Sequence, residues 1–161
     1  MQSILFVCTA NQCRSPIAAE LFKKLLQQKG FLSDEWTVES AGTWTRSGLP
    51  AASTCRKLAK LFDVDLSRHR TQSITDVSLT DYDLVIVMEQ GHYEALQLEF
   101  SAIRNKLYLL STLAGVRGKN IPDPLAKSNQ AAADIMRELS EYIQLAFGPI
   151  CLLTLKTNPL K

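Results

Sequence analysis

The feature that most constrains this chain lies near its N-terminus. Residues 4–7 read Ile-Leu-Phe-Val, an apolar run that is too short for a helix and is typical of a buried strand. A polar loop, Cys-Thr-Ala-Asn-Gln-Cys-Arg, occupies residues 8–14. Ser15 and Pro16 then form a helix-start signal, and apolar residues continue at helical spacing to Leu26. A strand, a tight loop and a helix in direct succession favour an α/β fold in which this loop lies at the ligand-binding edge of the sheet.

The rest of the chain repeats the alternation of strand and helix. Gly30 is a natural stop for the first helix. Residues 63–83 are polar with short turns, and residues 111–126 form a long loop of a kind that is often functional. The expected strands and helices imply a three-layer α/β/α domain with a four-stranded, parallel, doubly wound sheet of the flavodoxin-like type. Further strands are expected at residues 36–39, 84–88 and 107–110, and further helices at 51–62, 90–100 and 129–147.

Composition sets broad limits. The 161 residues suffice for one domain, and 46% hydrophobic with 21% charged residues is ordinary globular composition. A net charge of +2 gives no reason to expect nucleic acid as a partner. Four cysteines are too few for a disulfide scaffold, and we find no signal peptide or membrane-spanning run. A cytoplasmic protein is therefore expected, with residues 1–161 as one domain.

The loop carries a pattern that predicts chemistry. Cys8 ends the first strand, and the loop leads into a helix N-terminus, where free N–H groups attract an anion. Arg14 follows five residues after Cys8 and can bind two oxygens of a tetrahedral oxyanion held above the sulfur. The same positive surroundings favour the thiolate form of Cys8, which is a nucleophile. The alternative is a buried structural cysteine with a surface arginine.

These residues resemble the low-molecular-weight protein tyrosine phosphatase family. The matching segment is residues 7–16, Val-Cys-Thr-Ala-Asn-Gln-Cys-Arg-Ser-Pro, and the likeness covers roughly residues 3–147. Further matching segments are Ser40-Ala41-Gly42-Thr43, Gly48-Leu49-Pro50, His69, Val87-Met88-Glu89 and Pro122-Asp123-Pro124. The resemblance implies a cysteinyl-phosphate mechanism with Cys8 as nucleophile, and a single α/β domain with a four-stranded parallel sheet. No cofactor and no metal are expected, and the substrate would be a phosphorylated protein that releases inorganic phosphate.

Asp123 is the candidate general acid. A tyrosine phenolate is a poor leaving group at neutral pH, since the phenol has a pKa of roughly 10. The prolines at positions 122 and 124 restrict the backbone on both sides of Asp123 and so fix the direction of its carboxyl group. The Pro-Asp-Pro segment alone is equally compatible with an ordinary surface turn. The resemblance favours the acid role.

The resemblance also assigns residues around the nucleophile. Asn11, Ser15, Ser40 and His69 match positions that brace the loop by hydrogen bonds, and Ser15 could donate to the sulfur of Cys8. Without the resemblance, His69 would be read as a surface histidine and Ser15 as a simple helix cap. Substrate binding is expected from the loop residues Thr9, Ala10, Asn11, Gln12, Cys13 and Arg14.

Two apolar residues are expected to line the entrance to the site. Trp44 matches an aromatic residue that flanks the family's site, with core packing as the alternative. Leu125 stands where many relatives have Tyr or Phe, so the wall would remain apolar but could not be phosphorylated. Ala10 stands where many relatives have Gly, which would cost free energy if the loop needed positive φ at that position.

Cys13 is a candidate redox residue. It lies in the same loop as Cys8, and under oxidation the two could form a disulfide that protects the nucleophile from irreversible overoxidation. The alternative is a small, buried packing residue. Cys55 and Cys151 are expected to be structural.

The C-terminal segment, residues 148–161, is an atypical apolar extension. It follows the expected end of the last helix and contains the run Ile-Cys-Leu-Leu-Thr-Leu at residues 150–155. The segment could add an edge strand, pack on a helix, or mediate self-association through exposed apolar residues.

The predicted function is hydrolysis of phosphotyrosine in proteins, with three alternatives. Gln12 leaves a protein-arginine phosphatase open, although threonine at that position would favour it more. Arsenate reduction on the same fold would need a further pair of cysteines, and residues 80–110 contain none. A non-catalytic oxyanion-binding or redox-sensing module is disfavoured by the presence of Cys8, Arg14 and Asp123 together.

Overall fold

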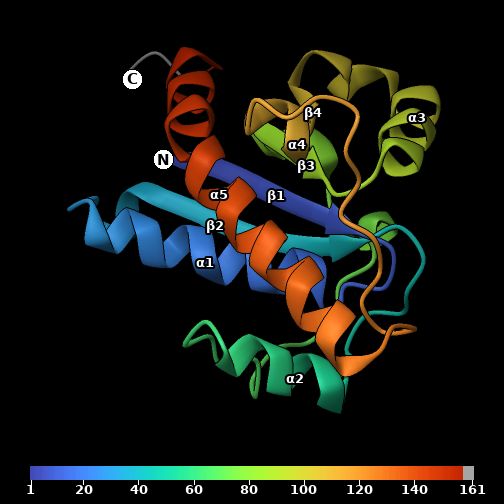
Figure 1. Ribbon diagram of the computed structural model, residues 1–161. Coiled ribbons are helices and arrows are strands. Elements are labelled where there is room, and N and C mark those ends of the chain that lie inside the picture. The colour runs from blue at the N-terminus through green and yellow to red at the C-terminus, as the bar shows by residue number, and fades with distance from the viewer. Residues whose placement is uncertain (158–161) are drawn as a thin grey trace.

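Four parallel strands form one sheet with the order β2-β1-β3-β4 (Figure 1). The structure is a computed structural model and describes residues 1–157. The strands are β1 (Gln2–Cys8), β2 (Trp36–Gly42), β3 (Leu84–Val87) and β4 (Leu107–Leu109). The helices are α1 (Arg14–Gln28), α2 (Ser53–Lys60), α3 (Gln90–Glu99), α4 (Leu110–Leu113) and α5 (Asn129–Thr157). Short 3-10 turns occur at Ser33–Glu35, Ile74–Asp76, Leu79–Asp81 and Ser101–Lys106.

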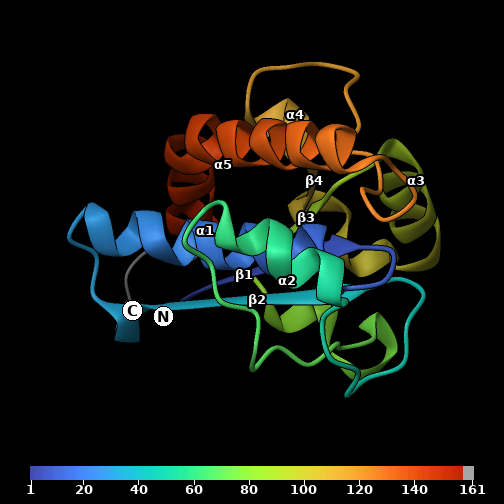
Figure 2. The same ribbon diagram turned by 60° about the horizontal axis from the view of Figure 1, so that its bottom comes forward.

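Helices or short turns cover both faces of the sheet because side chains alternate along each buried strand. Ile4 and Phe6 of β1 belong to the core shared with α1, α2 and α5. Leu5 and Val7 belong to a second core that includes residues of α3 and of the 3-10 turns. Figure 2 shows α1 and α5 together on one side of β1 and β2. The predicted three-layer parallel fold is confirmed.

The position of β1 determines where the loop with Cys8 lies. β1 pairs with β2 on one side and with β3 on the other, so Cys8 ends a central strand. In the register of the sheet, Cys8 is opposite Gly42 and Val7 is opposite Val87. The segments that follow β1, β2 and β3 therefore meet at one edge of the sheet, as expected for ligand binding in an open parallel sheet.

Several element boundaries differ from the sequence-based expectations. β2 continues to Gly42, because Ser40, Ala41 and Gly42 pair with β1. The second helix is shorter than predicted and spans Ser53–Lys60. The expected long loop after β4 begins with a short helix, α4, which contains two buried leucines, Leu110 and Leu113. Burial of these side chains explains a helical turn where the sequence showed no repeated helical spacing.

The expected break at residue 148 is wrong. Helix α5 continues to Thr157 with Pro149 inside it, and in Figure 1 its last turns point away from the axis of the first turns. A proline in a helix removes one hydrogen bond and bends the axis. Ile150 and Thr154 are fully buried, which offsets this cost, so residues 148–157 pack as a helix and do not add an edge strand. Residues 158–161 of the predicted extension lie outside the described residues. Leu152 and Leu155 remain exposed, and self-association through them stays a prediction.

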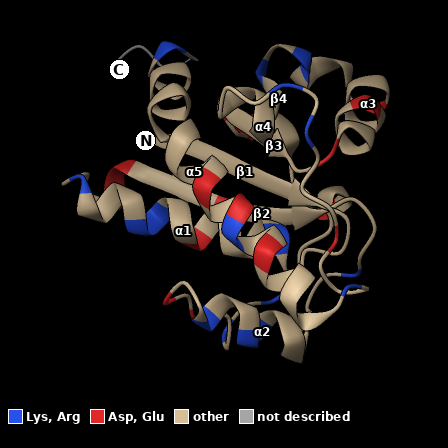
Figure 3. Cartoon of the chain, in the orientation of Figure 1, with Lys and Arg blue, Asp and Glu red and all other residues tan. Residues whose placement is uncertain are grey.

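Charged residues of both signs are interspersed over the elements in view in Figure 3. Among residues 1–157, no helix is long and apolar enough to cross a membrane.

Gly42 is required where β2 passes the loop after Cys8. A Cβ atom at this position would lie 2.6 Å from the carbonyl oxygen of Thr9 and 3.1 Å from the carbonyl carbon of Ala10. We expect Gly42→Ala to lower the free energy of unfolding by about 2 kcal/mol because backbone atoms must shift to make room. Thermal or denaturant unfolding measures this change.

Gly148→Ala is the matched control. Its Cβ would meet nothing within 4 Å, and Gly148 lies inside α5. Alanine there should raise stability by about 0.5–1 kcal/mol because it is the better helix former. Equal effects of the two substitutions would contradict the close approach at Gly42.

Candidate active site

The loop between β1 and α1 offers a row of free backbone donors. Within residues 1–157, the N–H groups of residues 9–13 donate no hydrogen bond to another part of the protein. They come just before the N-terminus of α1, whose N-cap residue Cys13 makes no side-chain capping bond. Free N–H groups at a helix N-terminus bind anions, because their partial positive charges add to the helix dipole. The loop therefore has the donors of an oxyanion site.

Asn11 holds the loop in its unusual conformation. Its φ of 53° lies in the left-handed region, which asparagine tolerates better than most residues. Its side-chain oxygen accepts a hydrogen bond from the N–H of Gln72 at 2.8 Å, and its amide nitrogen donates to the hydroxyls of Ser15 and Ser40, each at 2.9 Å. Ala10 is accommodated without strain, because the residue of this loop with positive φ is Asn11 and not Ala10.

His69 supports the same residue from outside the loop. Its Nε2 donates to the backbone oxygen of Asn11 at 2.7 Å, because a carbonyl oxygen only accepts. Burial lowers the pKa of His69, so the ring is neutral with its proton on Nε2. The sequence-predicted bracing contacts of Asn11, Ser15, Ser40 and His69 are all present in the structure.

The sulfur of Cys8 lies 3.0 Å from the hydroxyl oxygen of Ser15. Both side chains are buried. The Ser15 hydroxyl can also donate to the backbone oxygen of Ala41 at 3.3 Å, but it has only one proton. When Cys8 is a thiolate, the hydroxyl is the only donor of the pair and its proton points to sulfur. Ser15 thus stabilises negative charge on Cys8.

Arg14 is the largest fully buried side chain and is 2% exposed. One guanidinium nitrogen, Nη1, donates to the carboxylate of Glu89 and, at 2.8 Å, to the backbone oxygen of Ile121. The other, Nη2, lies 3.4 Å from the Thr9 hydroxyl and 3.9 Å from Oδ2 of Asp123. The guanidinium therefore connects the loop after β1 with residues that follow β3 and β4.

Glu89 and His92 are two further residues of the site to which the sequence analysis gave no role, although Glu89 lies in the matching segment Val87-Met88-Glu89. Glu89 directly follows Met88 at the end of the third strand and pairs with Arg14. His92 is 9% exposed, and its Nε2 lies 2.9 Å from the Thr9 hydroxyl. Burial lowers the pKa of His92, and the charge of Arg14 lowers it further. The available signal was the position of Glu89 at the carboxyl end of a strand that neighbours β1.

Asp123 lies beside Arg14, with its Oδ2 3.9 Å from Nη2 of the guanidinium. Its other oxygen, Oδ1, accepts a hydrogen bond from the N–H of Leu125 at 3.0 Å, which orients the carboxyl group. The carboxyl is partly exposed, so a substrate can reach it. The structure therefore brings together the three residues predicted to be catalytic, Cys8, Arg14 and Asp123, around one loop.

Trp44 and Leu125 present apolar surface next to these residues. The Trp44 side chain is 85% exposed and so does not pack in the core, and the backbone N–H of Trp44 donates to the backbone oxygen of Thr9 at 2.9 Å. Leu125 is 39% exposed and lies two residues after Asp123. Gln12 is half-buried within the loop. These side chains can contact the part of a substrate that lies outside the anion site.

The structure contains a disulfide that the sequence analysis did not predict, and a Cys8–Cys13 bond under oxidation stays a prediction. Cys13 is bonded to Cys55 of α2 and not to Cys8, while Cys8 and Cys151 are free and buried. The prediction had considered only the cysteine within the same loop. It could not foresee that the fold brings Cys55 of α2 within bonding distance of Cys13, the N-cap residue of α1.

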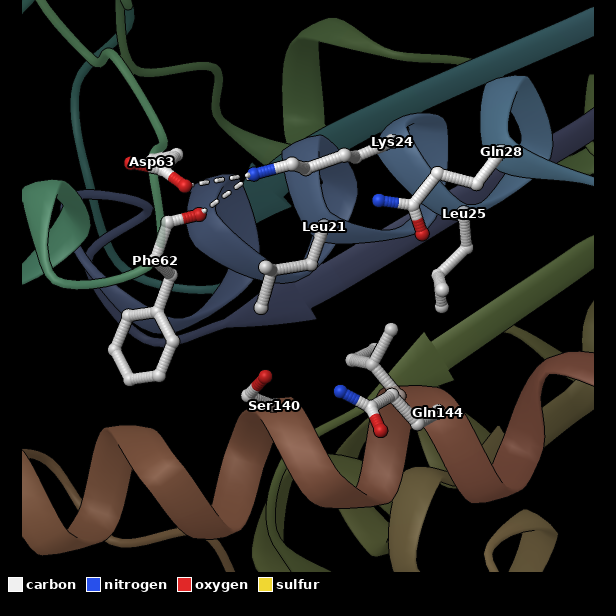
Figure 4. A pocket seen from close by; sticks show the side chains of 9 residues that line it. Leu21, Lys24, Leu25, Gln28, Phe62, Asp63, Ser140 and Gln144 are labelled. Carbon is white, nitrogen blue, oxygen red and sulfur yellow. Dashed lines mark hydrogen bonds and ion pairs between the residues drawn. The ribbon is translucent and has the colours of Figure 1, made fainter.

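A separate cavity of about 230 Å³ lies between α1 and α5 (Figure 4). Leu21, Leu25 and Ile143 are among the residues that line it, and the lining residue Lys24 donates to the backbone oxygen of Phe62 at 3.2 Å. None of the candidate catalytic residues lines this cavity. Among residues 1–157, no group of three or more His, Cys, Asp or Glu side chains could hold a metal ion.

A cysteine at the end of a parallel strand, a loop of free N–H groups and a buried arginine define a cysteine-dependent phosphatase of the α/β class. The family model for "low molecular weight phosphotyrosine protein phosphatase" matches residues 3–148. The chain belongs to this family, and it is therefore a hydrolase of phosphoric monoesters.

Individual relatives agree with this assignment. The low molecular weight protein-tyrosine-phosphatase Etp of Escherichia coli K12 is 34% identical over 129 residues, which cover 80% of this chain and 81% of Etp. A protein-arginine-phosphatase of Bacillus subtilis is 28% identical over 142 residues, or 88% of this chain and 91% of that protein. The crystal structure of a low molecular weight protein tyrosine phosphatase from T. tengcongensis superposes with a TM-score of 0.82 at 29% identity, covering 92% of this chain and 99% of the other.

The ion pair between Arg14 and Glu89 should support catalysis. We expect Glu89→Ala to lower kcat/KM for an aryl phosphate by about 10²-fold, because the guanidinium loses the partner that orients it. Glu89→Gln retains a hydrogen-bond acceptor and should lose less. Steady-state kinetics of the two variants measure the effect.

Glu99→Ala is the control for the removal of a carboxylate, because Glu99 is exposed at the end of α3. It should match the unmodified enzyme within about twofold, as expected for a surface substitution. Activity of Glu89→Ala at the same level as Glu99→Ala would contradict the orienting role.

The free energy of unfolding should fall in mild acid, because His69 and His92 are neutral side chains in the folded protein. Burial lowers the pKa of His69 and of His92 below the unfolded value, so the unfolded chain binds protons first as pH falls. This contribution to stability is present above about pH 6.5 and is lost below it. For His92, Arg14 acts in the same direction as burial, and Glu89 opposes it.

His92→Gln tests this contribution, because glutamine can still bond to the Thr9 hydroxyl but does not titrate. The free energy of unfolding, measured from about pH 7 to about pH 5, should decrease less in the variant than in the unmodified protein. Identical pH dependence of the two proteins would exclude a buried neutral His92.

Proposed function

We propose that this hydrolase removes phosphate from phosphotyrosine in proteins. The observation that supports the proposal most directly is that Cys8, Arg14 and Asp123 surround the loop of free N–H groups, with Trp44 and Leu125 exposed beside it. An exposed indole and a leucine side chain suit a flat aromatic leaving group. The name of the E. coli relative, a protein-tyrosine-phosphatase, is consistent with this substrate.

In the first step the thiolate of Cys8 attacks phosphorus opposite the ester oxygen. The phosphorus–oxygen bond breaks, a cysteinyl phosphate forms, and Asp123 gives its proton to the leaving phenolate. Arg14 and the N–H groups of residues 9–13 bind the equatorial oxygens, which carry the negative charge of the transition state. The bond from Leu125 to Asp123 keeps the carboxyl group directed toward this position.

In the second step water attacks the cysteinyl phosphate. The Asp123 carboxylate, deprotonated after the first step, takes a proton from the water molecule. The phosphorus–sulfur bond breaks and Cys8 leaves as a thiolate, which the hydroxyl of Ser15 stabilises from 3.0 Å. Inorganic phosphate is released, and the chemistry needs no cofactor.

Phosphoarginine is the second candidate substrate, because a protein-arginine-phosphatase is among the relatives. The same groups would act on it, since the phosphoryl group is identical and only the leaving atom changes from oxygen to nitrogen. The exposed aromatic and aliphatic side chains of Trp44 and Leu125 favour the phenyl ring of tyrosine.

We also propose that the enzyme acts in the cytoplasm on phosphorylated proteins, without nucleic acid as a partner. The supporting argument is chemical, because a cysteine nucleophile must stay reduced to work. Cys8 is a free thiol in the structure.

Two peptides and one variant test the substrate and the nucleophile. The substrate is tested with the unmodified enzyme, and the nucleophile is tested with Cys8→Ser. The enzyme should hydrolyse a phosphotyrosine peptide at least about tenfold faster, by kcat/KM, than a phosphoarginine peptide of the same sequence. Cys8→Ser should lower both rates by more than about 10³-fold because the serine hydroxyl is not ionised at neutral pH. Phosphate binding, measured by calorimetry, should survive the substitution.

Two results would contradict these assignments. Hydrolysis by Cys8→Ser near the rate of the unmodified enzyme would remove Cys8 as the nucleophile. Faster hydrolysis of the phosphoarginine peptide would contradict phosphotyrosine as the substrate and favour phosphoarginine.

Asp123→Asn tests the proton donor. The variant should lose about 10²- to 10³-fold in kcat/KM for phenyl phosphate, whose leaving group needs a proton. The loss should be much smaller for aryl phosphates with strongly acidic phenols, because these leave as anions. A plot of log kcat/KM against leaving-group acidity measures the difference, and parallel plots for variant and unmodified enzyme would exclude Asp123 as the acid.

A further inference from the structure

The Cys13–Cys55 disulfide joins the catalytic loop to α2. Cys13 is the N-cap residue of α1, Cys55 lies in the first turn of α2, and 42 positions separate them in the sequence. Both side chains are buried. Neither helix has a side-chain cap at its N-terminus, and a reduced cysteine at a helix N-terminus is in general a better nucleophile than a free cysteine.

Cys13 is related to two other cysteines, to Cys8 in the same loop and to Cys55 through the disulfide. It shares the short loop with Cys8, and the loop closes on itself because the Cys8 sulfur contacts Ser15, two residues beyond Cys13. Cys8, Cys13 and Cys55 also belong to one buried cluster. Cys13 is therefore the one member of the three that is next to the nucleophile in the loop and bonded to the third cysteine.

We propose that Cys55 is a second resolving cysteine, which returns Cys8 to its active form after oxidation by a hydroperoxide. The proposal rests on the role of Cys8 as the thiolate nucleophile. It assigns to this site the reduction of one equivalent of hydroperoxide, with Cys13 and Cys55 as the source of both electrons.

The exchange has three balanced steps. The Cys8 thiolate attacks the terminal oxygen of the hydroperoxide, whose O–O bond breaks, so that a sulfenic acid and an alcohol or water form. The Cys13 thiolate attacks the Cys8 sulfur, and hydroxide leaves and is protonated to water. The Cys55 thiolate attacks the Cys13 sulfur, and the Cys8 thiolate leaves. The product has the Cys13–Cys55 disulfide and a free Cys8, which is the state in the structure.

The groups around Cys8 determine which thiolate leaves in the third step. In thiol–disulfide exchange the better stabilised thiolate leaves faster. Cys8 has the hydroxyl of Ser15 at 3.0 Å and lies at the loop of free N–H groups, so it is the favoured leaving group. A disulfide in a reducing compartment is usually redox-active, and this one leaves the nucleophile reduced. The fourth cysteine, Cys151, lies in α5 and forms no disulfide, and burial raises its pKa to about 11, so it is not assigned a part in the exchange.

The test starts from fully reduced protein that has been freed of reductant and is active on an aryl phosphate. One equivalent of hydrogen peroxide is added, activity is followed, and disulfides are mapped by mass spectrometry after alkylation. The unmodified enzyme should lose activity, recover most of it without added thiol, and accumulate the Cys13–Cys55 disulfide. Cys55→Ala should accumulate a Cys8–Cys13 disulfide and stay at least about tenfold less active until dithiothreitol is added.

Two controls separate this exchange from a purely structural disulfide. Cys151→Ala should behave as the unmodified enzyme. Cys8→Ser should form the Cys13–Cys55 disulfide far more slowly at the same peroxide dose, because oxidation must enter through Cys8. Spontaneous recovery of Cys55→Ala, or equally fast disulfide formation in Cys8→Ser, would overturn the proposal.

The design also separates this inference from the phosphatase assignment. The activity of the reduced enzyme before peroxide reports on the phosphatase alone, and disulfide mapping needs no activity. The activity of reduced Cys55→Ala before peroxide is added shows whether this variant is folded. Cys55→Ser is a second substitution at the same position and should give the same result. Loss of recovery in one variant only would assign the effect to packing and overturn the proposal.

Discussion

The burial of the Arg14 charge determines the arrangement of the whole site. A guanidinium with 2% exposure is costly to remove from water unless its donors are satisfied and its charge is balanced. Glu89 and the backbone oxygen of Ile121 meet this requirement on one nitrogen, and they come from segments after β3 and in the long loop. The second nitrogen lies 3.4 Å from Thr9 and 3.9 Å from Asp123, where it can still bind an oxyanion. One buried charge thus holds three segments around the position where phosphate is proposed to bind.

A second constraint keeps the loop itself in place. The left-handed backbone of Asn11 needs support, and the hydrogen bonds from Gln72 and His69 provide it from a segment far along the chain. Gly42 lets β2 approach within van der Waals distance of the same loop. The N–H of Thr43 then donates to the backbone oxygen of Cys8 at 2.9 Å. Since the outer surface of the loop uses these contacts, its own N–H groups remain free for an anion.

The sequence predicted the features that depend on residues close together along the chain. The strand, loop and helix from residue 4 to residue 26 follow from local periodicity and capping, and the proline-flanked Asp123 stood out for the same local reason. Glu89 was named in a matching segment but received no role, because its pairing with Arg14 depends on β1 and β3 being adjacent, which the sequence pattern does not specify. The last helix was expected to end near residue 147, but tertiary burial of Ile150 and Thr154 outweighs a local cost of about 3 kcal/mol for Pro149 inside the helix.

Phosphate transfer and the proposed reaction with peroxide have the same physical origin. Free N–H groups, the Ser15 hydroxyl and the Arg14 guanidinium together favour negative charge at the end of β1. They lie beside both the proposed position of a phosphoryl oxygen and the sulfur of Cys8, so the groups proposed to serve phosphate transfer also surround the thiol that the peroxide reaction would use. A nearby thiol pair can remove that oxidation only if its final disulfide leaves Cys8 out. The bond between Cys13 and Cys55 meets this condition, because it uses the sulfur next to the nucleophile and ends on a helix outside the loop.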